Sequence, residues 1–131
     1  MVFLMSIISI SLSEENLRSL DHLQKANNLS GRSEAIRVAL RCAEAEVRDR
    51  ESLKGEVEGV LIVVHSSHNA PVLDALKHDF QQITPTQIHS HLKSNKCLEV
   101  FIIRGEAGPV QEMVASFQKD DMINYVKFVQ S

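Results

Sequence analysis

The stretch TQIHSHLKSNKCLEVFIIR, residues 86–104, decides the fold of the second half of the chain. Residues 86–92 alternate between apolar and polar side chains, which is typical of a half-buried strand. Residues 93–96 have the composition of a turn, and residues 97–104 return as a more apolar strand. We therefore predict a β-hairpin in which Ile88 and Leu92 supply core contacts while His89 and His91 share the other face.

The patterns around this hairpin extend it to a complete domain. The fully apolar run at 60–64 predicts a buried strand, and residues 71–83 carry apolar side chains at helical spacing. After the hairpin, residues 108–120 are helical in pattern and residues 123–130 predict a last strand. The predicted order from residue 60 to the end is βαββαβ, which is the ferredoxin-like or ACT-like arrangement.

The first fifty residues have a different pattern, predicted to be strand, helix, helix. Residues 6–13 alternate strictly, and Ser13 precedes a helix whose first turn is acidic. A second helix begins near Ser33. Because a single strand lacks a partner for its backbone, we expect two copies of it to pair in a dimer. We assign residues 1–50 to this domain, the polar residues 51–59 to a linker, and residues 60–131 to the second domain.

Composition narrows the classes of function. The 131 residues contain no apolar run near the roughly 20 needed to cross a bilayer, and no signal peptide is recognisable, so we predict a cytoplasmic protein without a membrane span. Acidic and basic residues balance in the first half. Binding to nucleic acid would therefore depend on the local placement of a few cations.

Three residues of the hairpin are candidate metal ligands. His89 and His91 share a strand face, and Cys97 lies just across the turn, where its thiolate could complete a chelate. Three ligands make an incomplete coordination sphere. The alternative interpretation is a pair of exposed histidines beside a buried free cysteine.

The wider spacing of these residues resembles a known family. His78 lies eleven positions before the HxH motif, and Cys97 lies six positions after it and is followed by Leu-Glu. This pattern is similar to that of the nickel-responsive regulators of the NikR family, in which a ribbon-helix-helix DNA-binding domain precedes an ACT-like domain. The resemblance covers essentially the whole chain and implies an α+β fold with an intertwined N-terminal dimer.

The resemblance also implies a metal site. In such a site His89, His91 and Cys97 of one subunit and His78 of the partner subunit would bind Ni(II) in a square plane. Glu99 shares a strand face with Cys97 and is a candidate acceptor that orients a ligand, the alternative being a solvated carboxylate. His65 and His68 are candidates for an outer or alternative metal site, the alternative being ordinary polar residues of a loop.

A second set of candidate residues concerns DNA. The segment GRSEAIR, residues 31–37, is similar to the start of the second helix in the family, where Arg32, Ser33 and free backbone N–H groups would contact phosphate. The resemblance implies that the outward residues of the paired strands, here Ile7, Ser9 and Ser11, face the bases of a double-stranded operator.

These expectations define a homotetrameric, metal-responsive transcriptional regulator, a repressor built as a dimer of dimers, and not an enzyme. One alternative is a regulator of the same fold that responds to copper, cobalt or zinc. A second is a metal-binding module with lost or altered DNA recognition, because relatives carry an arginine at the position of Ile7.

Overall fold

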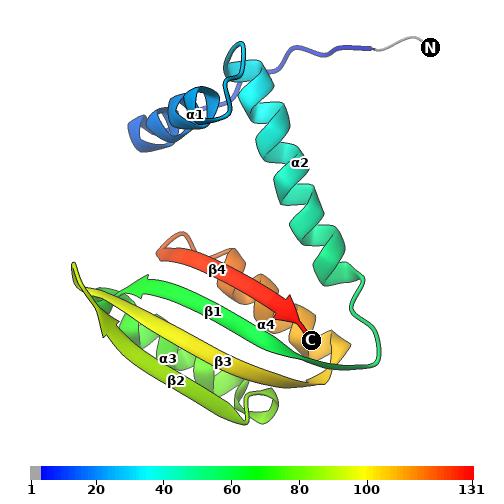
Figure 1. Cartoon of the computed structure of the whole chain (residues 1–131), viewed down its shortest axis with the longest axis vertical. Helices are drawn as coiled ribbons and strands as arrows, with labels where there is room; N and C mark the ends of the chain where they lie inside the picture. Colours follow the sequence, from blue (N-terminus) through cyan, green and yellow to red (C-terminus); the bar gives the residue numbers. More distant parts are fainter. Residues whose placement is uncertain (1–3) are drawn as a thin grey trace. The chain divides into compact units, whose positions relative to one another are not determined.

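The chain forms two compact units (Figure 1). The structure, a computed structural model, describes residues 4–131, except for the side chains at positions 69 and 70. We call the part up to Val47 the N-terminal unit and the part Arg48–Ser131 the C-terminal unit. Each unit has its own elements and is described by itself.

Two helices make up the regular secondary structure of the N-terminal unit. Helix α1 spans Glu14–Ala26, and the Ser13 hydroxyl caps it by accepting from the backbone N–H of Asn16 at 3.1 Å. Helix α2 spans Arg32–Glu51 and so runs past the boundary of the unit. Both helices agree with the prediction from the sequence. No helix within residues 4–131 has the length and apolar character needed to cross a membrane.

The strand expected at residues 6–13 is not formed in the single chain. Residues 4–13 have no regular secondary structure, and their apolar side chains are exposed, Ile7 at 99%. The physical reason is that a strand needs a neighbouring strand to accept and donate its backbone hydrogen bonds, and one copy of the chain offers none here.

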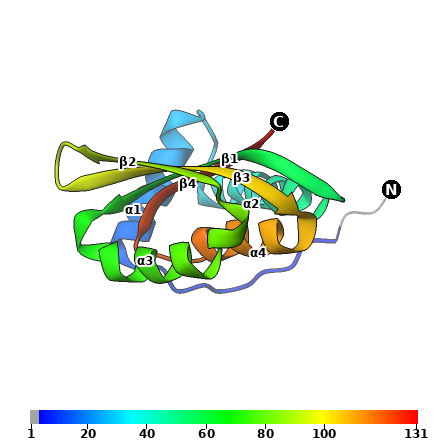
Figure 2. The ribbon, with the colours of Figure 1, turned by 90° about the horizontal axis from the view of Figure 1, so that it is seen from below.

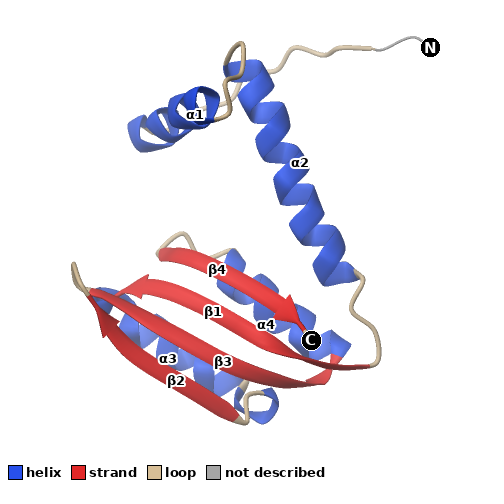
Figure 3. Ribbon diagram, in the orientation of Figure 1, coloured by secondary structure: helices blue, strands red, loops and turns tan. Residues whose placement is uncertain are grey.

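The C-terminal unit is a four-stranded sheet with two helices on one of its faces (Figures 2 and 3). Its elements are β1 (Glu56–Ser66), α3 (Ala70–Asp79), β2 (Thr86–Leu92), β3 (Lys96–Glu106), α4 (Ala107–Gln118) and β4 (Ile123–Gln130), with short 3-10 turns at Ser67–Asn69 and Gln81–Ile83. The strand order is β2-β3-β1-β4, and every pair is antiparallel. The predicted βαββαβ order is confirmed.

The first strand is longer than its apolar run suggested. Helix α2 ends at Glu51 and β1 begins at Glu56, so only residues 52–55 lie between regular elements. The residues expected as linker at 56–59 pair with β3, with Glu56 opposite Glu106. Glu56 and Glu58 are tolerated there because alternate positions of β1 face solvent. Gly59 is buried, and a Cβ at this position would collide with the Val129 carbonyl oxygen and the Phe128 ring.

The core lies between the sheet and the helices α3 and α4. Its buried members are Leu53, Val57, Leu61, Val63, Leu73, Ile83, Phe101, Ile103, Val110, Met113, Val114 and Phe117. On β1 and β3 these residues alternate with half-buried ones, as expected for strands with one covered face.

None of the described helices of the C-terminal unit covers the opposite face of the sheet, which we call the open sheet face (Figure 2). Ile88 and Leu92 lie on this face, 56% and 41% exposed, with Tyr125 and Val129. The expectation that Ile88 and Leu92 supply core contacts within the chain was therefore wrong. The register sets the opposite arrangement, because the histidines of β2 pair with the buried residues of β3.

Candidate metal centre and nucleic-acid interface

The β2–β3 hairpin brings the three candidate metal ligands together. Ser94 and Asn95 adopt left-handed backbone conformations in the turn, and the register then places His91 opposite Cys97 and His89 opposite Glu99. One ligand atom from each of His89, His91 and Cys97 lies within 4.8 Å of the other two. The Cys97 sulfur is 3.6 Å from Nδ1 of His91.

Burial differs among these three residues. Cys97 is buried, whereas His89 and His91 are exposed on the edge strand β2, with ring centroids 4.9 Å apart in an edge-on arrangement. The thiol side of this group therefore lies inside the sheet, and its imidazole side is accessible to solvent. Such a nitrogen and sulfur set fits a borderline transition metal such as Ni(II).

Glu99 is fully buried beside this group and holds several hydrogen bonds. Lys77 of α3 donates to its Oε1 at 2.9 Å, Gln87 of β2 donates to its Oε2 at 3.0 Å, and Nδ1 of His89 makes a short contact with Oε1. Burial alone would raise the pKa of Glu99, but these hydrogen bonds and the Lys77 charge lower it below its usual range. A solvated carboxylate is excluded by this burial.

The contact between Glu99 and His89 has a consequence for metal binding. With Nδ1–H of His89 donating to the carboxylate, Nε2 retains its lone pair for a metal. A ligating histidine commonly donates its other N–H to a carboxylate, which fixes the ring orientation and raises its basicity. The geometry thus supports the positioning role expected for Glu99.

His78 is not part of this group in the described chain. It is exposed on the last turn of α3, one residue after Lys77, and the group of candidate ligands contains only the three hairpin residues. Among the described residues, a single chain therefore brings three candidate ligands within 4.8 Å of one another.

His65 is a residue that the sequence reasoning placed wrongly. It lies in β1 and not in a loop, it is 1% exposed, and it pairs with Cys97 across β1 and β3. The signal was available, because Leu61, Val63 and His65 continue one alternating face of the strand. His68 is exposed in the following turn, as expected.

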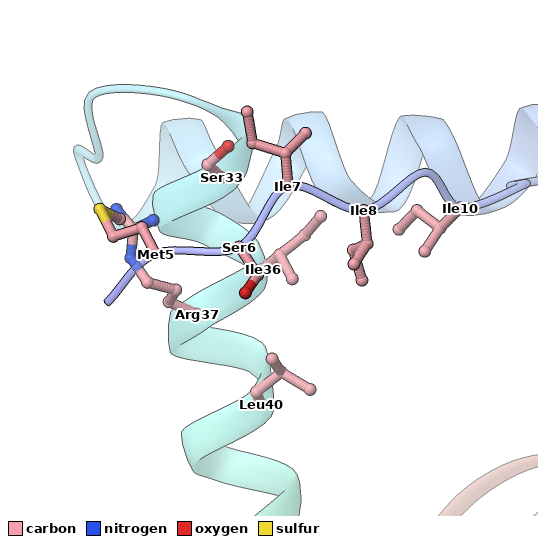
Figure 4. Close-up of a pocket in the computed structure, with 9 residues that line it drawn as sticks. All are labelled: Met5, Ser6, Ile7, Ile8, Ile10, Ser33, Ile36, Arg37 and Leu40. Carbon is pink, nitrogen blue, oxygen red and sulfur yellow. The ribbon is translucent and has the colours of Figure 1, made fainter. Parts of the chain in front are cut away.

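The candidate base-reading residues all lie in the extended N-terminal segment. Ile7, Ser9 and Ser11 are exposed. Figure 4 shows Ile7 and Ile8 projecting to opposite sides of this segment. The alternation predicted from the sequence is thus present even though no strand forms within the single chain.

The candidate phosphate-contacting residues lie at the start of α2. Arg32 donates to both carboxylate oxygens of Asp21, at 2.9 and 3.2 Å. This pairing raises the pKa of Arg32 and lowers that of Asp21. Ser33 lies at the rim of a hollow lined by the N-terminal segment and α2. Arg32 must therefore share its donors with Asp21 if it contacts phosphate.

Two family models match the chain. The model of the copG family of ribbon-helix-helix proteins matches residues 6–46, and the model of the NikR C terminal nickel binding domain matches residues 58–131. The second match spans more than half of the chain. The chain belongs to the NikR family of nickel-responsive regulators.

Relatives of the NikR family match nearly full length. A nickel-responsive regulator from Methanococcus maripaludis strain S2 is 30% identical over 126 residues, covering 94% of this chain and 89% of the relative. Those from Methanothrix thermoacetophila and Methanocaldococcus jannaschii are 32% and 33% identical, covering 92% and 83% of this chain and 88% and 79% of the relatives.

A solved structure supports the fold alone. The uncharacterized protein TM1266 from Thermotoga maritima aligns with a TM-score of 0.53 at 12% identity, covering 57% of this chain and 96% of that protein.

Membership in the NikR family establishes the general function. The chain is a nickel-responsive transcription regulator with a ribbon-helix-helix DNA-binding domain and a nickel-binding domain, and it is not an enzyme. The sequence predictions of the family, the α+β fold class and Ni(II) are confirmed.

Proposed function

We propose that Ni(II) is held by His89, His91 and Cys97 of one subunit and by His78 of the partner subunit, and that its binding controls attachment to a double-stranded DNA operator. The observation that carries this proposal is the hairpin group, whose three ligand atoms lie within 4.8 Å of one another. The buried Glu99 supports it, because its carboxylate orients His89 through a hydrogen bond.

The exposure of His78 supports a ligand that crosses between subunits. His78 projects from the last turn of α3 and does not join the hairpin group of its own chain. Lys77, its neighbour, is tied to Glu99 at 2.9 Å. This contact holds the end of α3 against the metal-binding hairpin of its own chain. A metal ion in a partner subunit that binds His78 would therefore be connected, through α3 and Glu99, to the ligands of this chain.

The exposed apolar surfaces support assembly of a homotetramer as a dimer of dimers. The open sheet face carries Ile88, Leu92, Tyr125 and Val129, all between 41% and 56% exposed, and a second copy of the same face would cover them. This contact would join C-terminal units.

A second apolar surface lies in the N-terminal unit. The extended segment and α2 line a hollow of about 670 Å³ whose walls include Ile8, Ile10, Ile36 and Leu40 (Figure 4). A second copy of the segment would fill it with its own apolar side chains while the two strands pair. This contact would join N-terminal units.

On this proposal the paired segments lie in the major groove with Ile7, Ser9 and Ser11 toward the bases, and the start of α2, with Arg32 and Ser33, lies near phosphate. Ile7 offers only apolar contact, so the operator would be read by the serines and by groove shape. The protein would act in the cytoplasm, where the DNA is.

Metal binding is coupled to DNA binding if Ni(II) prefers one arrangement of the subunits. A ligand shifts an equilibrium only by its differential affinity for the two states. Ligands from two chains provide such a difference, because only the arrangement that brings His78 of the partner subunit to the hairpin completes the site. That arrangement would set the spacing of the two DNA-binding dimers.

The test is a Ni(II) titration of the full chain followed by absorption, with Cys97→Ala as the variant and Cys42→Ala as its control. Cys42 is an exposed cysteine of α2. We expect Cys97→Ala to abolish the thiolate-to-metal absorption and to weaken binding at least about 100-fold, while Cys42→Ala behaves as the wild type. An unchanged isotherm in Cys97→Ala would refute the ligand set.

The second half of the test concerns DNA. We expect the nickel-loaded wild type to select a two-fold symmetric sequence from a random duplex pool and the metal-free protein to select none. Nickel binding without any sequence selection would instead favour a metal-binding module with altered DNA recognition. The observation that favours this second function is Ile7, an exposed apolar residue at a candidate base-reading position.

A further inference from the structure

His65 is the one described side chain with a buried nitrogen that lacks a hydrogen-bond partner. Its ring is 1% exposed, and Nδ1 lies 2.8 Å from the carbonyl oxygen of Ser66. Nδ1 therefore carries the proton and donates it to that carbonyl. Nε2 is left with a free lone pair in the interior, where polar groups are normally satisfied.

This nitrogen lies beside the metal-binding group. His65 lies opposite Cys97 on one side of β3, and His91 lies opposite Cys97 on the other side, so the three side chains form a row on one face of the sheet. Nε2 of His65 is 3.5 Å from Oε1 of Glu99, the same oxygen that His89 contacts. His65 thus borders the cluster from the side opposite to solvent, just outside the three ligand atoms that lie within 4.8 Å of one another.

The backbone supports this placement of the ring. The pairing of β1 with β4 shifts register between Val64 and His65. A bulge of this kind bends a strand and redirects a side chain, and bulges occur often beside functional sites. The result is a histidine whose proton is fixed on a backbone carbonyl and whose other nitrogen is bare, which is the arrangement typical of a metal-ligating histidine.

We propose that His65 is an alternative fourth ligand, supplied within the chain, that completes a site with His89, His91 and Cys97 for metals that favour a tetrahedral sphere, such as Zn(II) and Co(II). The proposal rests on the hairpin ligands of the proposed function. It differs in the source of the fourth ligand, which is His65 of the same subunit and not His78 of the partner subunit.

The two fourth ligands have different consequences for regulation. A metal bound with His65 is held entirely by one chain, so it does not favour any arrangement of the subunits. A metal bound with His78 of the partner subunit ties two chains together. The choice between the two histidines would let the protein bind several divalent metals while responding to one of them, since geometry rather than affinity separates such metals.

The experiment uses Co(II), whose visible absorption reports the number and type of its ligands, with the full-length protein and three variants. These are His65→Gln, His78→Ala and the control His68→Gln, which changes an exposed histidine three residues from His65. We expect His78→Ala and His68→Gln to keep the intense four-coordinate bands of the wild type. His65→Gln should lose them and bind Co(II) about tenfold more weakly or worse.

Ni(II) provides the reciprocal measurement. We expect Ni(II) binding to be retained in His65→Gln, which also demonstrates that this variant folds, and lost in His78→Ala. If His65→Gln fails to fold, X-ray absorption of Zn(II)-loaded His78→Ala decides the matter by counting its ligands. Three histidines and one sulfur support the proposal, whereas two histidines and one sulfur overturn it.

The proposal is also overturned if His78→Ala abolishes the Co(II) bands while His65→Gln preserves them. His65 would then act only as a buried neighbour of Glu99, and the proposed nickel site would stand. A Cys97→Ala variant with unchanged Ni(II) binding would instead refute the ligand set shared by both proposals, so the two failures are distinguishable.

Discussion

The C-terminal unit buries its apolar side chains within one chain, whereas the N-terminal unit leaves most of its large apolar side chains exposed. In the C-terminal unit a contiguous core joins the sheet to α3 and α4. In the N-terminal unit only Leu20 and Ala35 are buried among the described residues. Both halves have clear amphipathic patterns in the sequence. The comparison teaches that an amphipathic pattern indicates which face of a helix or strand must be buried. It does not indicate whether the residues that bury this face belong to the same chain or to a second copy.

The polar interactions follow the same division. Buried Glu99 is satisfied within the C-terminal unit by Lys77, Gln87 and His89. In the N-terminal unit the ion pair of Arg32 with Asp21 is exposed. Exposed pairs contribute little to stability, so in the proposed dimer the N-terminal unit would be stabilised mainly by apolar contacts with the second copy.

The substitution Ile8→Ser should have the largest effect on stability. It tests whether the N-terminal unit, unlike the C-terminal unit, needs a second chain to bury its apolar side chains. Ile8 faces α2 across the hollow, so its loss should destabilise the proposed N-terminal dimer by about 1.5–3 kcal/mol per chain. The measurement is the thermal unfolding of α1 and α2 by circular dichroism at several protein concentrations.

The matched control is Ile7→Ser, on the opposite side of the segment (Figure 4). We expect its thermal unfolding to stay within about 0.5 kcal/mol of the wild type and its effect to fall on DNA binding. Equal destabilisation by both substitutions would show that the segment does not pair with one face toward α2.

An intermediate effect is expected from Glu99→Gln in the C-terminal unit. The neutral amide holds Lys77 and His89 less strongly, so Ni(II) affinity should fall about 10–100-fold. Competition with a chelator measures this change. Glu58→Gln serves as the control, because Glu58 is exposed and pairs only at the surface with Arg104. A matching loss in both variants would mean that general charge, and not the orientation of His89, sets the affinity.

The smallest effect is expected from acid, and it should fall on the N-terminal unit. Arg32 lowers the pKa of Asp21, and hydrogen bonds from Ser30 lower the pKa of Glu34. Groups with a depressed pKa in the folded state contribute stability above their unfolded pKa, and this contribution is lost as pH falls through the folded value. The thermal unfolding temperature of α1 and α2 should therefore decrease slightly between about pH 5 and pH 3.

The control for this prediction is the double variant Asp21→Asn, Glu34→Gln. It should show a flatter dependence on pH across the same window, because the groups that titrate are gone. An identical slope in the variant and the wild type would assign the acid sensitivity to other carboxylates.

Much of the candidate site could be predicted from residues that are close in sequence. His89, His91 and Cys97 belong to one hairpin, and alternation along a strand with a short turn is enough to bring them together. The assignment of Ile88 and Leu92 to the core was wrong, because alternation separates two faces of a strand without indicating which face the helices cover.

Alternation could have placed His65 on the buried face of its strand, but not beside Cys97. Its proximity to Cys97 depends on β1 lying beside β3, a pairing between segments about thirty residues apart in the chain. The same pairing explains why Glu99 is buried: β3 is a central strand, and Lys77 reaches Glu99 from α3.

By itself the sequence determined the order of the elements from residue 14 onward, the helix start after Ser13, the hairpin and its three candidate ligands, because these depend on local periodicity and turn chemistry. Only the tertiary structure decided which sheet face is open, that Glu99 is a buried acceptor and that His65 borders the metal-binding group. These features depend on strand order and helix cover, which arise from contacts between distant segments and leave no periodic signal in any one of them.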